Sequence, residues 1–273
     1  MSSRVDTPGW LVAMLGWKPA TAKSARRCTE LFGAAIAPNL ADVGGIESLR
    51  LAGEVFRLLN VTQRTTTTLS DEAGDSDESS TGAALERCIA SDVETMLKEE
   101  DPSRDWLVTR TGDVSRYAQF KHLRALQALF ERQPALRATL GRDYQVKTDV
   151  YVGVKHPNDI MADPFLHAAI SCKWTIRSDR VQNVRYEFAT LVRNRRGRLP
   201  HLVLVTAEPL PSRLISIARG TGEVDTVYHL FFDELHEAVE QVGAKGQRQQ
   251  WREMVEQGRL RSYAELISDL VLS

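Results

Sequence analysis

The segment LPHLVLVTAEP, from Leu199 to Pro209, is the feature that most constrains the fold. It is a nearly continuous apolar run, which is typical of a central strand buried on both faces. A helical pattern with Ser178 as candidate N-cap and Gly197 as stop precedes it. Before that helix lies another apolar segment, HAAISCKW. This strand–helix–strand order predicts a parallel strand pair with a helical crossover.

The rest of the chain predicts an α/β protein with a mixed central sheet flanked by helices. Alternating residues predict a strand at Tyr144 to Gly153, and VYHLFF predicts another. Helices are expected at Ile46 to Asn60, after Thr81 as N-cap, at about Tyr117 to Arg132, and in DELHEAVEQV and SYAELISDLVL. We expect one domain over residues 1–273, with an N-terminal helical part at about 1–135, an α/β core at about 140–235 and C-terminal helices at about 233–273.

Composition excludes several classes of protein. Of the 273 residues, 42% are hydrophobic and 26% are charged, with a formal net charge of −1, as in ordinary globular proteins. The three cysteines form no C-x-x-C pair and the six histidines show no zinc spacing, so a structural zinc site is not expected. The N-terminus lacks a signal-peptide pattern and no apolar run is long enough to span a bilayer. We therefore expect a cytoplasmic bacterial protein with no membrane partner.

A small, acidic segment runs from Ser70 to Gly82, SDEAGDSDESSTG. It contains no large apolar residue, so it predicts a solvated loop that contributes little to folding.

Four polar side chains are expected to meet around the strand that ends at Trp174. Period two places Ser171 and Lys173 on one face of that strand, and Asp149 interrupts a neighbouring apolar strand. Glu187 shares a helix face with Val184, Phe188 and Leu191, so it should point toward the sheet. Singly, such residues indicate buried ion pairs or snorkelling side chains. Together, an acid, S-x-K and a second acid favour Mg²⁺-dependent phosphodiester hydrolysis.

The residues RSDR, from Arg177 to Arg180, occupy the start of the helix that carries Glu187. The first turn of a helix in the major groove contacts bases, with arginine on guanine and aspartate on cytosine. The alternative is helix capping with surface ion pairs. Further along, VRNRRGR includes Arg195 and Arg196, which are either phosphate contacts or a solvated helix end.

The stretch SCKWTIRSDR followed by Glu187 resembles the type II restriction endonucleases that recognise a CCGG core. The similarity continues through LVRNRRGRLPHLVLVTAEPLPSRLISIARGTGEVDTVYHL, with weaker matches at GAALE, RYAQFKHL and LGRDYQVKTD. It begins at about Leu40 and is strongest from Leu166 to Leu235. The resemblance implies a restriction-endonuclease-like fold of the PD-(D/E)xK type, in which Ser171 stands where many nucleases have an acid.

The resemblance also implies a role for each matching residue. Asp149 would be the principal metal ligand, with the main-chain carbonyl of Cys172 and the carboxylate of Glu187 completing the site. Lys173 would position the water and the scissile phosphate, and Glu86 would support the site from a helix. The inner CCGG would be read by Arg177, Ser178, Asp179 and Arg180, and an outer G·C pair by Arg213 and Asp42, which makes GCCGGC the expected full site.

The expected protein is therefore an Mg²⁺-dependent endonuclease, with two ions per active site, that acts on double-stranded DNA. A palindromic site requires at least a homodimer, and a homotetramer is the alternative. Two other functions stay open: a repair or recombination nuclease on the same fold, and a non-catalytic DNA-binding protein. GTGE, from Gly220 to Glu223, lacks the P-loop pattern, so no nucleotide cofactor is expected.

Overall fold

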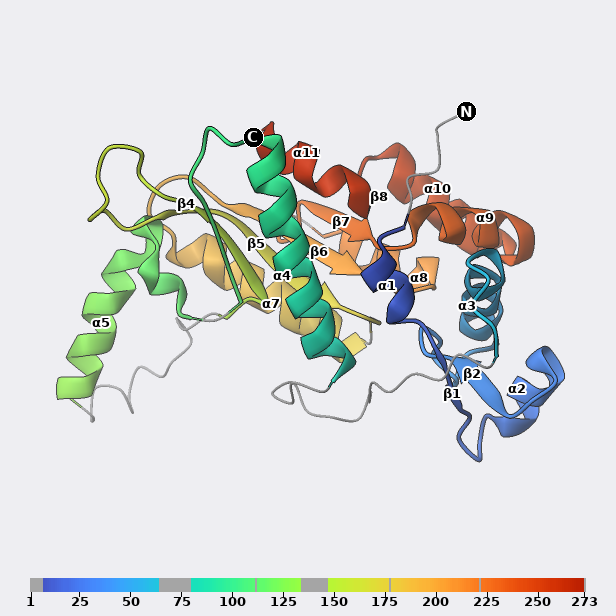
Figure 1. The fold of residues 1–273 in the computed structure, drawn as a ribbon. Helices are drawn as coiled ribbons and strands as arrows, with labels where there is room; N and C mark the ends of the chain where they lie inside the picture. The colour runs from blue at the N-terminus through green and yellow to red at the C-terminus, as the bar shows by residue number, and fades with distance from the viewer. Residues whose placement is uncertain are drawn as a thin grey trace.

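The computed structural model describes residues 7–63, 80–110, 112–133, 147–176, 178–220 and 222–272, and only the backbone of 178–180. The helices are α1 (Gly9–Ala13), α2 (Ala25–Phe32), α3 (Ile46–Leu58), α4 (Thr81–Glu100), α5 (Lys121–Arg132), α7 (Ser178–Asn194), α8 (Pro211–Ala218), α9 (Phe232–Val242), α10 (Lys245–Glu256) and α11 (Leu266–Val271). The strands are β1 (Trp17–Pro19), β2 (Ile36–Pro38), β3 (Trp106–Thr109), β4 (Val150–Val154), β5 (Phe165–Lys173), β6 (His201–Thr206), β7 (Thr226–His229) and β8 (Leu260–Ser262). Figure 1 shows their arrangement.

A six-stranded mixed sheet forms the centre of the molecule, in the order β3-β4-β5-β6-β7-β8. The pairs β3–β4 and β4–β5 are antiparallel, whereas β5–β6, β6–β7 and β7–β8 are parallel. The predicted mixed α/β class is confirmed. The predicted parallel pair is confirmed as well, because α7 crosses over between β5 and β6 and returns the chain to the same edge.

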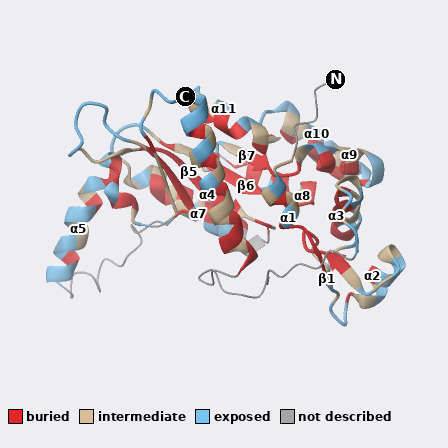
Figure 2. Ribbon diagram, in the orientation of Figure 1, coloured by how far each residue is buried: buried red, intermediate tan, exposed pale blue. Residues whose placement is uncertain are grey.

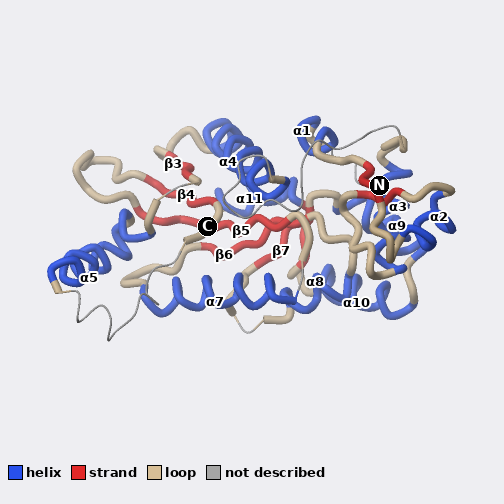
Figure 3. Tube along the Cα trace, turned by 90° about the horizontal axis from the view of Figure 1, so that it is seen from below, coloured by secondary structure: helices blue, strands red, loops and turns tan. Residues whose placement is uncertain are grey.

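Helices cover both faces of this sheet, which explains the long apolar runs in its central strands (Figures 2 and 3). Figure 3 shows α4 and α11 on one side of the strands and α7, α8 and α10 on the other. In β6 every residue after His201 is buried. In α7 the buried residues follow helical spacing at Val181, Val184, Phe188 and Leu191. A strand packed on two faces cannot alternate apolar with polar residues.

The strand predicted at Tyr144 to Gly153 is wrong at its start. It begins at Val150, and its first predicted residues, 144–146, lie outside the described part of the chain. The Thr148 N–H donates a hydrogen bond to the Tyr151 hydroxyl at 3.1 Å. The Thr148 hydroxyl donates to the Ile170 carbonyl at 3.0 Å. These side-chain hydrogen bonds replace ladder bonds and hold Asp149 just outside the strand.

Short strands occur where only helices were expected. β3 lies within the N-terminal part and pairs with β4, and β8 lies within the C-terminal part and pairs with β7. Both are edge strands of three or four residues, too short to show a clear alternation. The helix α4 also begins differently: Ser80, not Thr81, is its N-cap, because the Ser80 hydroxyl accepts from the Ala83 N–H at 3.1 Å.

A small antiparallel sheet, β1–β2, packs beside α2 and α3 near the N-terminus. The turn after β2 is fixed by buried Asn39, whose Nδ2 donates to the Met14 carbonyl at 2.8 Å. This turn delivers Asp42, whose N–H donates to the Ser48 hydroxyl at 2.8 Å at the start of α3. Among the helices described, none is long and apolar enough to cross a membrane. The acidic loop from Ser70 to Ser79 lies outside the described residues.

Candidate active site

Asp149 is the centre of a polar cluster at the edge of the sheet where β4 begins and β5 ends. Its Oδ2 accepts hydrogen bonds from the Ser171 hydroxyl at 3.1 Å, the Cys172 N–H at 2.6 Å and the Lys173 ammonium at 2.8 Å. The antiparallel register Val150↔Ile170 brings the start of β4 beside this end of β5. The side chains of Ser171 and Lys173 reach the same carboxylate, as period two predicts.

Lys173 is held as a cation inside this cluster. Its side chain is only 21% exposed. Burial alone would lower the pKa of Lys173, but the charge and hydrogen bond of Asp149, together with the charge of Glu187, raise it above the ordinary value. Lys173 is therefore suited to compensate negative charge and not to act as a base.

Glu86 approaches the cluster from α4, on the opposite face of the sheet from α7. Burial and the nearby charge of Asp149 raise the pKa of Glu86 to about 7, and Lys173 and Arg110 partly oppose this rise. Arg110 follows β3, with its Nη2 3.7 Å from Glu86 Oε2. The sequence prediction that Glu86 adjoins the site is consistent with this placement.

Glu187 approaches from α7 and points inward, as its helix face predicts. One of its carboxylate oxygens is buried, and its neighbours Val184, Phe188 and Leu191 lie in the core. Its negative charge acts on Lys173 and on buried Tyr151, so it lies near both. Three carboxylates from α4, the start of β4 and α7 thus surround one ammonium group.

The donor set suits a hard divalent cation, although the side chains are not gathered into a ready coordination shell. Within the described part of the chain, no three His, Cys, Asp or Glu side chains are grouped as metal ligands. The Lys173 ammonium instead forms an ion pair with the Asp149 carboxylate. Carboxylate oxygens are nevertheless the ligands that Mg²⁺ prefers. Burial and, after it, the charge of Asp149 raise the pKa of Glu86, and a cation would relieve the repulsion between these two carboxylates.

Cys172 is unsuited to bind a metal through sulfur. The side chain is buried, and burial raises the pKa of its thiol well above the ordinary value, so the thiol stays protonated. If Cys172 takes part, it does so through its main chain, as the resemblance implies.

The two residues expected to read an outer base pair are in contact. Arg213, in the first turn of α8, forms an ion pair with Asp42, although they are 171 positions apart in the sequence. Arg177 lies outside the described residues. Ser178, Asp179 and Arg180 form the start of α7, and only their backbone is described.

Arg195 and Arg196 directly follow the C-terminal end of α7, about 12 Å along the helix axis from Glu187. Arg195 donates to the Val192 carbonyl, and the Arg196 N–H donates to the Gln119 carbonyl at 2.9 Å. These bonds are compatible with both sequence readings, a phosphate contact and a solvated helix end.

Sequence reasoning did not select Arg110 or Glu208. Glu208 follows β6 directly and is fully buried, with an oxygen 3.6 Å from Arg213 Nη1. Its sequence signal is a carboxylate between a buried strand and a proline, in TAEP.

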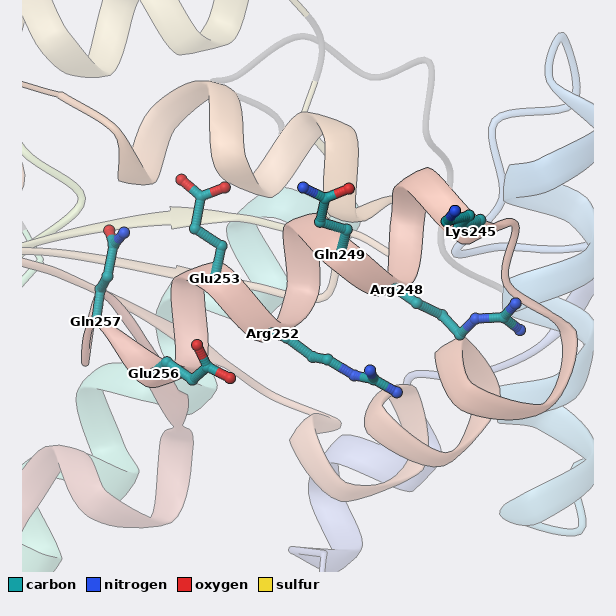
Figure 4. Close-up of a pocket in the computed structure, with 7 residues that line it drawn as sticks. All are labelled: Lys245, Arg248, Gln249, Arg252, Glu253, Glu256 and Gln257. Atoms are coloured by element: carbon teal, nitrogen blue, oxygen red, sulfur yellow. The ribbon is translucent and has the colours of Figure 1, made fainter.

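A groove of about 490 Å³ lies elsewhere, along one helix (Figure 4). Its lining comes from α10 and the residue that caps it: Lys245, Arg248, Gln249, Arg252, Glu253, Glu256 and Gln257. Arg252 pairs with Glu240 at 2.7 Å and Glu253 with Arg219 at 2.7 Å, so its charges are balanced by neighbouring elements. It shares no residue with the cluster around Asp149.

Comparison with known proteins agrees with this geometry. The family described as "NgoMIV restriction enzyme" matches residues 27–161 and 151–272. A relative, the type II restriction enzyme NgoMIV of Neisseria gonorrhoeae, is 39% identical over 221 residues, or 70% of this chain and 77% of that protein. Among solved structures, the complex of restriction endonuclease PspGI with its substrate DNA aligns at a TM-score of 0.35 with 12% identity. That alignment covers 70% of this chain and 60% of that one, and we draw nothing from so distant a likeness.

The class of protein is thus a type II restriction endonuclease. Within this class, the chain belongs to the NgoMIV restriction enzyme family. The family resemblance expected from the sequence is confirmed. A divalent metal cofactor and a double-stranded DNA partner follow from this class at a general level.

Proposed function

We propose that this endonuclease hydrolyses double-stranded DNA in an Mg²⁺-dependent reaction, at a palindromic site with a CCGG core, with GCCGGC as the full site. The observation that carries the proposal is the contact of Asp149 with Ser171, Cys172 and Lys173 at the end of β5. The chain passes from this cluster into the first turn of α7 within a few residues. Cleavage and base reading would then be performed by adjacent parts of one segment.

Each residue of the cluster has a distinct role in the proposal. Asp149, Glu187 and the main-chain carbonyl of Cys172 would hold Mg²⁺, two ions per site, and the metal would supply activation of water and neutralisation of the phosphate. Lys173 would compensate the charge that develops on the phosphate as the water oxygen bonds to phosphorus and a P–O bond breaks. Ser171 would keep Asp149 oriented, and Glu86 would adjust the charge of the site from α4.

Base reading would use two sets of residues. The segment Arg177 to Arg180 would read the inner CCGG from the major groove, with arginines on guanine and Asp179 on cytosine. The Arg213–Asp42 pair would read the outer G·C pair, in which arginine donates to guanine and aspartate accepts from cytosine. Arg195 and Arg196, which directly follow α7, would contact phosphates and not bases, and a solvated helix end is the alternative.

The expected assembly is a homodimer, because a two-fold protein matches a two-fold DNA site. A homotetramer is the alternative, and sedimentation of the protein with and without duplex distinguishes the two.

Plasmid cleavage with sequencing of the cut ends tests the function directly. We expect Asp149→Ala and Lys173→Ala to retain specific binding to GCCGGC duplexes and to lose nearly all cleavage, since both act on the phosphate and not on the bases. Glu187→Ala should behave in the same way, with partial recovery at higher Mg²⁺. A wild-type protein that cuts sites without CCGG would refute the proposed specificity.

Metal binding has a readout that does not depend on cleavage. A ligand that binds the folded state raises the unfolding temperature by mass action. Mg²⁺ should therefore raise the unfolding temperature of the wild type and have little effect on Asp149→Ala. An equal rise in both proteins would remove Asp149 from the metal site.

A further inference from the structure

Glu208 is a fully buried carboxylate at the edge of the sheet where β6 ends. Its Oε2 accepts from the Ile176 N–H at 2.7 Å, and its Oε1 accepts from the Leu210 N–H at 3.1 Å. A buried carboxylate is costly to desolvate, so such a group persists only where its oxygens have partners. Here the partners are the backbone N–H groups of Ile176 and Leu210.

The position of Glu208 is fixed by its backbone as well. Its N–H donates to the Thr206 hydroxyl at 3.2 Å, and its carbonyl accepts from His229 Nε2 at 3.1 Å. The Phe231 N–H donates to His229 Nδ1, so the proton of this neutral imidazole is on Nε2. Because Lys173, Thr206 and His229 are register partners, Glu208 is anchored to the same sheet edge as the catalytic cluster.

Glu208 also provides a negative charge behind Arg213. Arg213 Nη1 lies 3.6 Å from Glu208 Oε2, while Nη2 contacts Asp42. Asp42 is 39% exposed and can exchange partners with a base, whereas Glu208 cannot reach solvent. The Arg213 guanidinium thus lies between buried Glu208, which orients it, and the partly exposed carboxylate of Asp42.

We propose that Glu208 is a positioning residue for sequence recognition, which sets both the main chain at Ile176 and the guanidinium of Arg213. Ile176 directly precedes Arg177, so one carboxylate links the segment that reads the inner bases to the residue that reads the outer pair. This inference rests on the proposed function. It extends that function by coupling two recognition elements that the sequence treats as separate.

Glu208→Gln tests this coupling with little change in volume. In the carboxylate, one oxygen faces the Ile176 N–H and Arg213, and the other accepts from the Leu210 N–H. The amide keeps one oxygen and replaces the other by NH₂, which is a donor. One of these two sides therefore loses its acceptor. We expect discrimination to fall at the inner and the outer pairs together, by about tenfold each, within the range of about 5- to 150-fold that one bidentate base contact provides. Arg213→Ala should relax the outer pair alone.

The measurement is a ratio, which keeps folding effects out of the result. Duplexes that differ from GCCGGC by one base pair are cleaved by a single preparation, and each rate is divided by the rate on GCCGGC. Misfolded protein lowers both rates equally and leaves the ratio unchanged. Glu234→Gln is the matched control, because Glu234 is a buried carboxylate in α9 with 8% exposure and no contact with Arg213 among the bonds described. It should keep wild-type ratios.

A pH series on the wild type provides a second readout. Burial raises the pKa of Glu208 to about 7, so protonation below this pH would mimic the amide. The charged groups that face Glu208 are Arg213 from α8 and Asp42 from the turn after β2, and His229 from β7 is neutral because burial lowers its pKa to about 4. Discrimination by the wild type should therefore fall as pH drops through about 7, whereas Glu208→Gln should show no such change.

The outcomes are distinguishable. A wild type with no sequence preference would overturn the proposed function and this inference with it. A selective wild type with an equally selective Glu208→Gln, or with a loss confined to the outer pair, would overturn the inference alone. If Glu208→Gln does not fold, discrimination by the wild type that stays constant across the pH series would overturn it instead.

Discussion

Replacing Asp149 by Asn tests the cluster through stability in the absence of metal. The amide keeps the shape of the side chain and an oxygen for the three donors, but it removes the negative charge. Hydrogen bonds to a charged group contribute about 1.5–3 kcal/mol and neutral ones about 0.5–1.5 kcal/mol. The loss is thus about 1 kcal/mol for each of the two neutral donors, the Ser171 hydroxyl and the Cys172 N–H. The lost ion pair with Lys173 adds about 1 kcal/mol, which gives about 3 kcal/mol in total.

Part of this loss is returned by Glu86. The Asp149 charge is the second cause, after burial, of the raised pKa of Glu86, and its removal relieves that repulsion. Glu86 is partly exposed, so solvent screening keeps this return below about 1 kcal/mol. We therefore expect Asp149→Asn to lower the free energy of unfolding by about 2–3 kcal/mol near neutral pH.

The assay is urea unfolding with a chelator present, at one protein concentration because the stability of an oligomer depends on it. Asp105→Asn is the matched control: Asp105 also pairs with a lysine, Lys155, at 3.1 Å, but the two side chains are 62% and 52% exposed. That surface pair should contribute less than about 1 kcal/mol. If the two variants lower the free energy of unfolding equally, the argument from burial and charge is refuted.

Three further predictions follow from single contacts. Gly153→Ala should destabilise the fold by about 1–3 kcal/mol, because an added Cβ lies 2.8 Å from a ring carbon of Tyr117. The control is Gly246→Ala, which has open space around it and should be neutral or stabilising in the same unfolding assay. Burial lowers the pKa of His167 to about 4, so the unfolded chain binds a proton that the folded chain does not as pH falls from about 6.5 to 4. Stability should drop in that window by up to about 1.4 kcal/mol per pH unit, and an unchanged slope in His167→Gln would contradict this. Arg213→Ala should cost about 1–3 kcal/mol of discrimination at the outer base pair in duplex cleavage, and an effect on all sequences alike would mean a phosphate contact.

Periodic features of the sequence predicted the centre of the fold and most of the side chains that gather around Asp149. In β6 and α7, apolar residues recur at several positions with the spacing of a buried strand or of one helix face. Each further apolar residue strengthens the secondary-structure assignment. The same periodicity placed Ser171 and Lys173 on one face and turned Glu187 inward. The contacts of Asp149 then follow from the pairing of two strands.

Features that depend on one contact between distant residues were not predictable. The start of β4 depends on the hydroxyl of Thr148, and no local pattern records that bond. Glu208 meets Ile176 across 32 positions through a turn without periodicity.

The antiparallel pairing of β4 with β5 determines where the chain can tolerate an insertion. Asp149 precedes β4 and Lys173 ends β5, so the hairpin loop between these strands, residues 155–164, lies at the opposite end of the strands from the polar cluster around Asp149. The loop tip is solvated, with Ile160 97% and Met161 87% exposed. Doubling the length of a flexible loop costs only about 0.6 kcal/mol in closure entropy. This hairpin is therefore a place where a peptide tag or an added segment can be accommodated while the register of β4 and β5 continues to hold Asp149 beside Ser171 and Lys173.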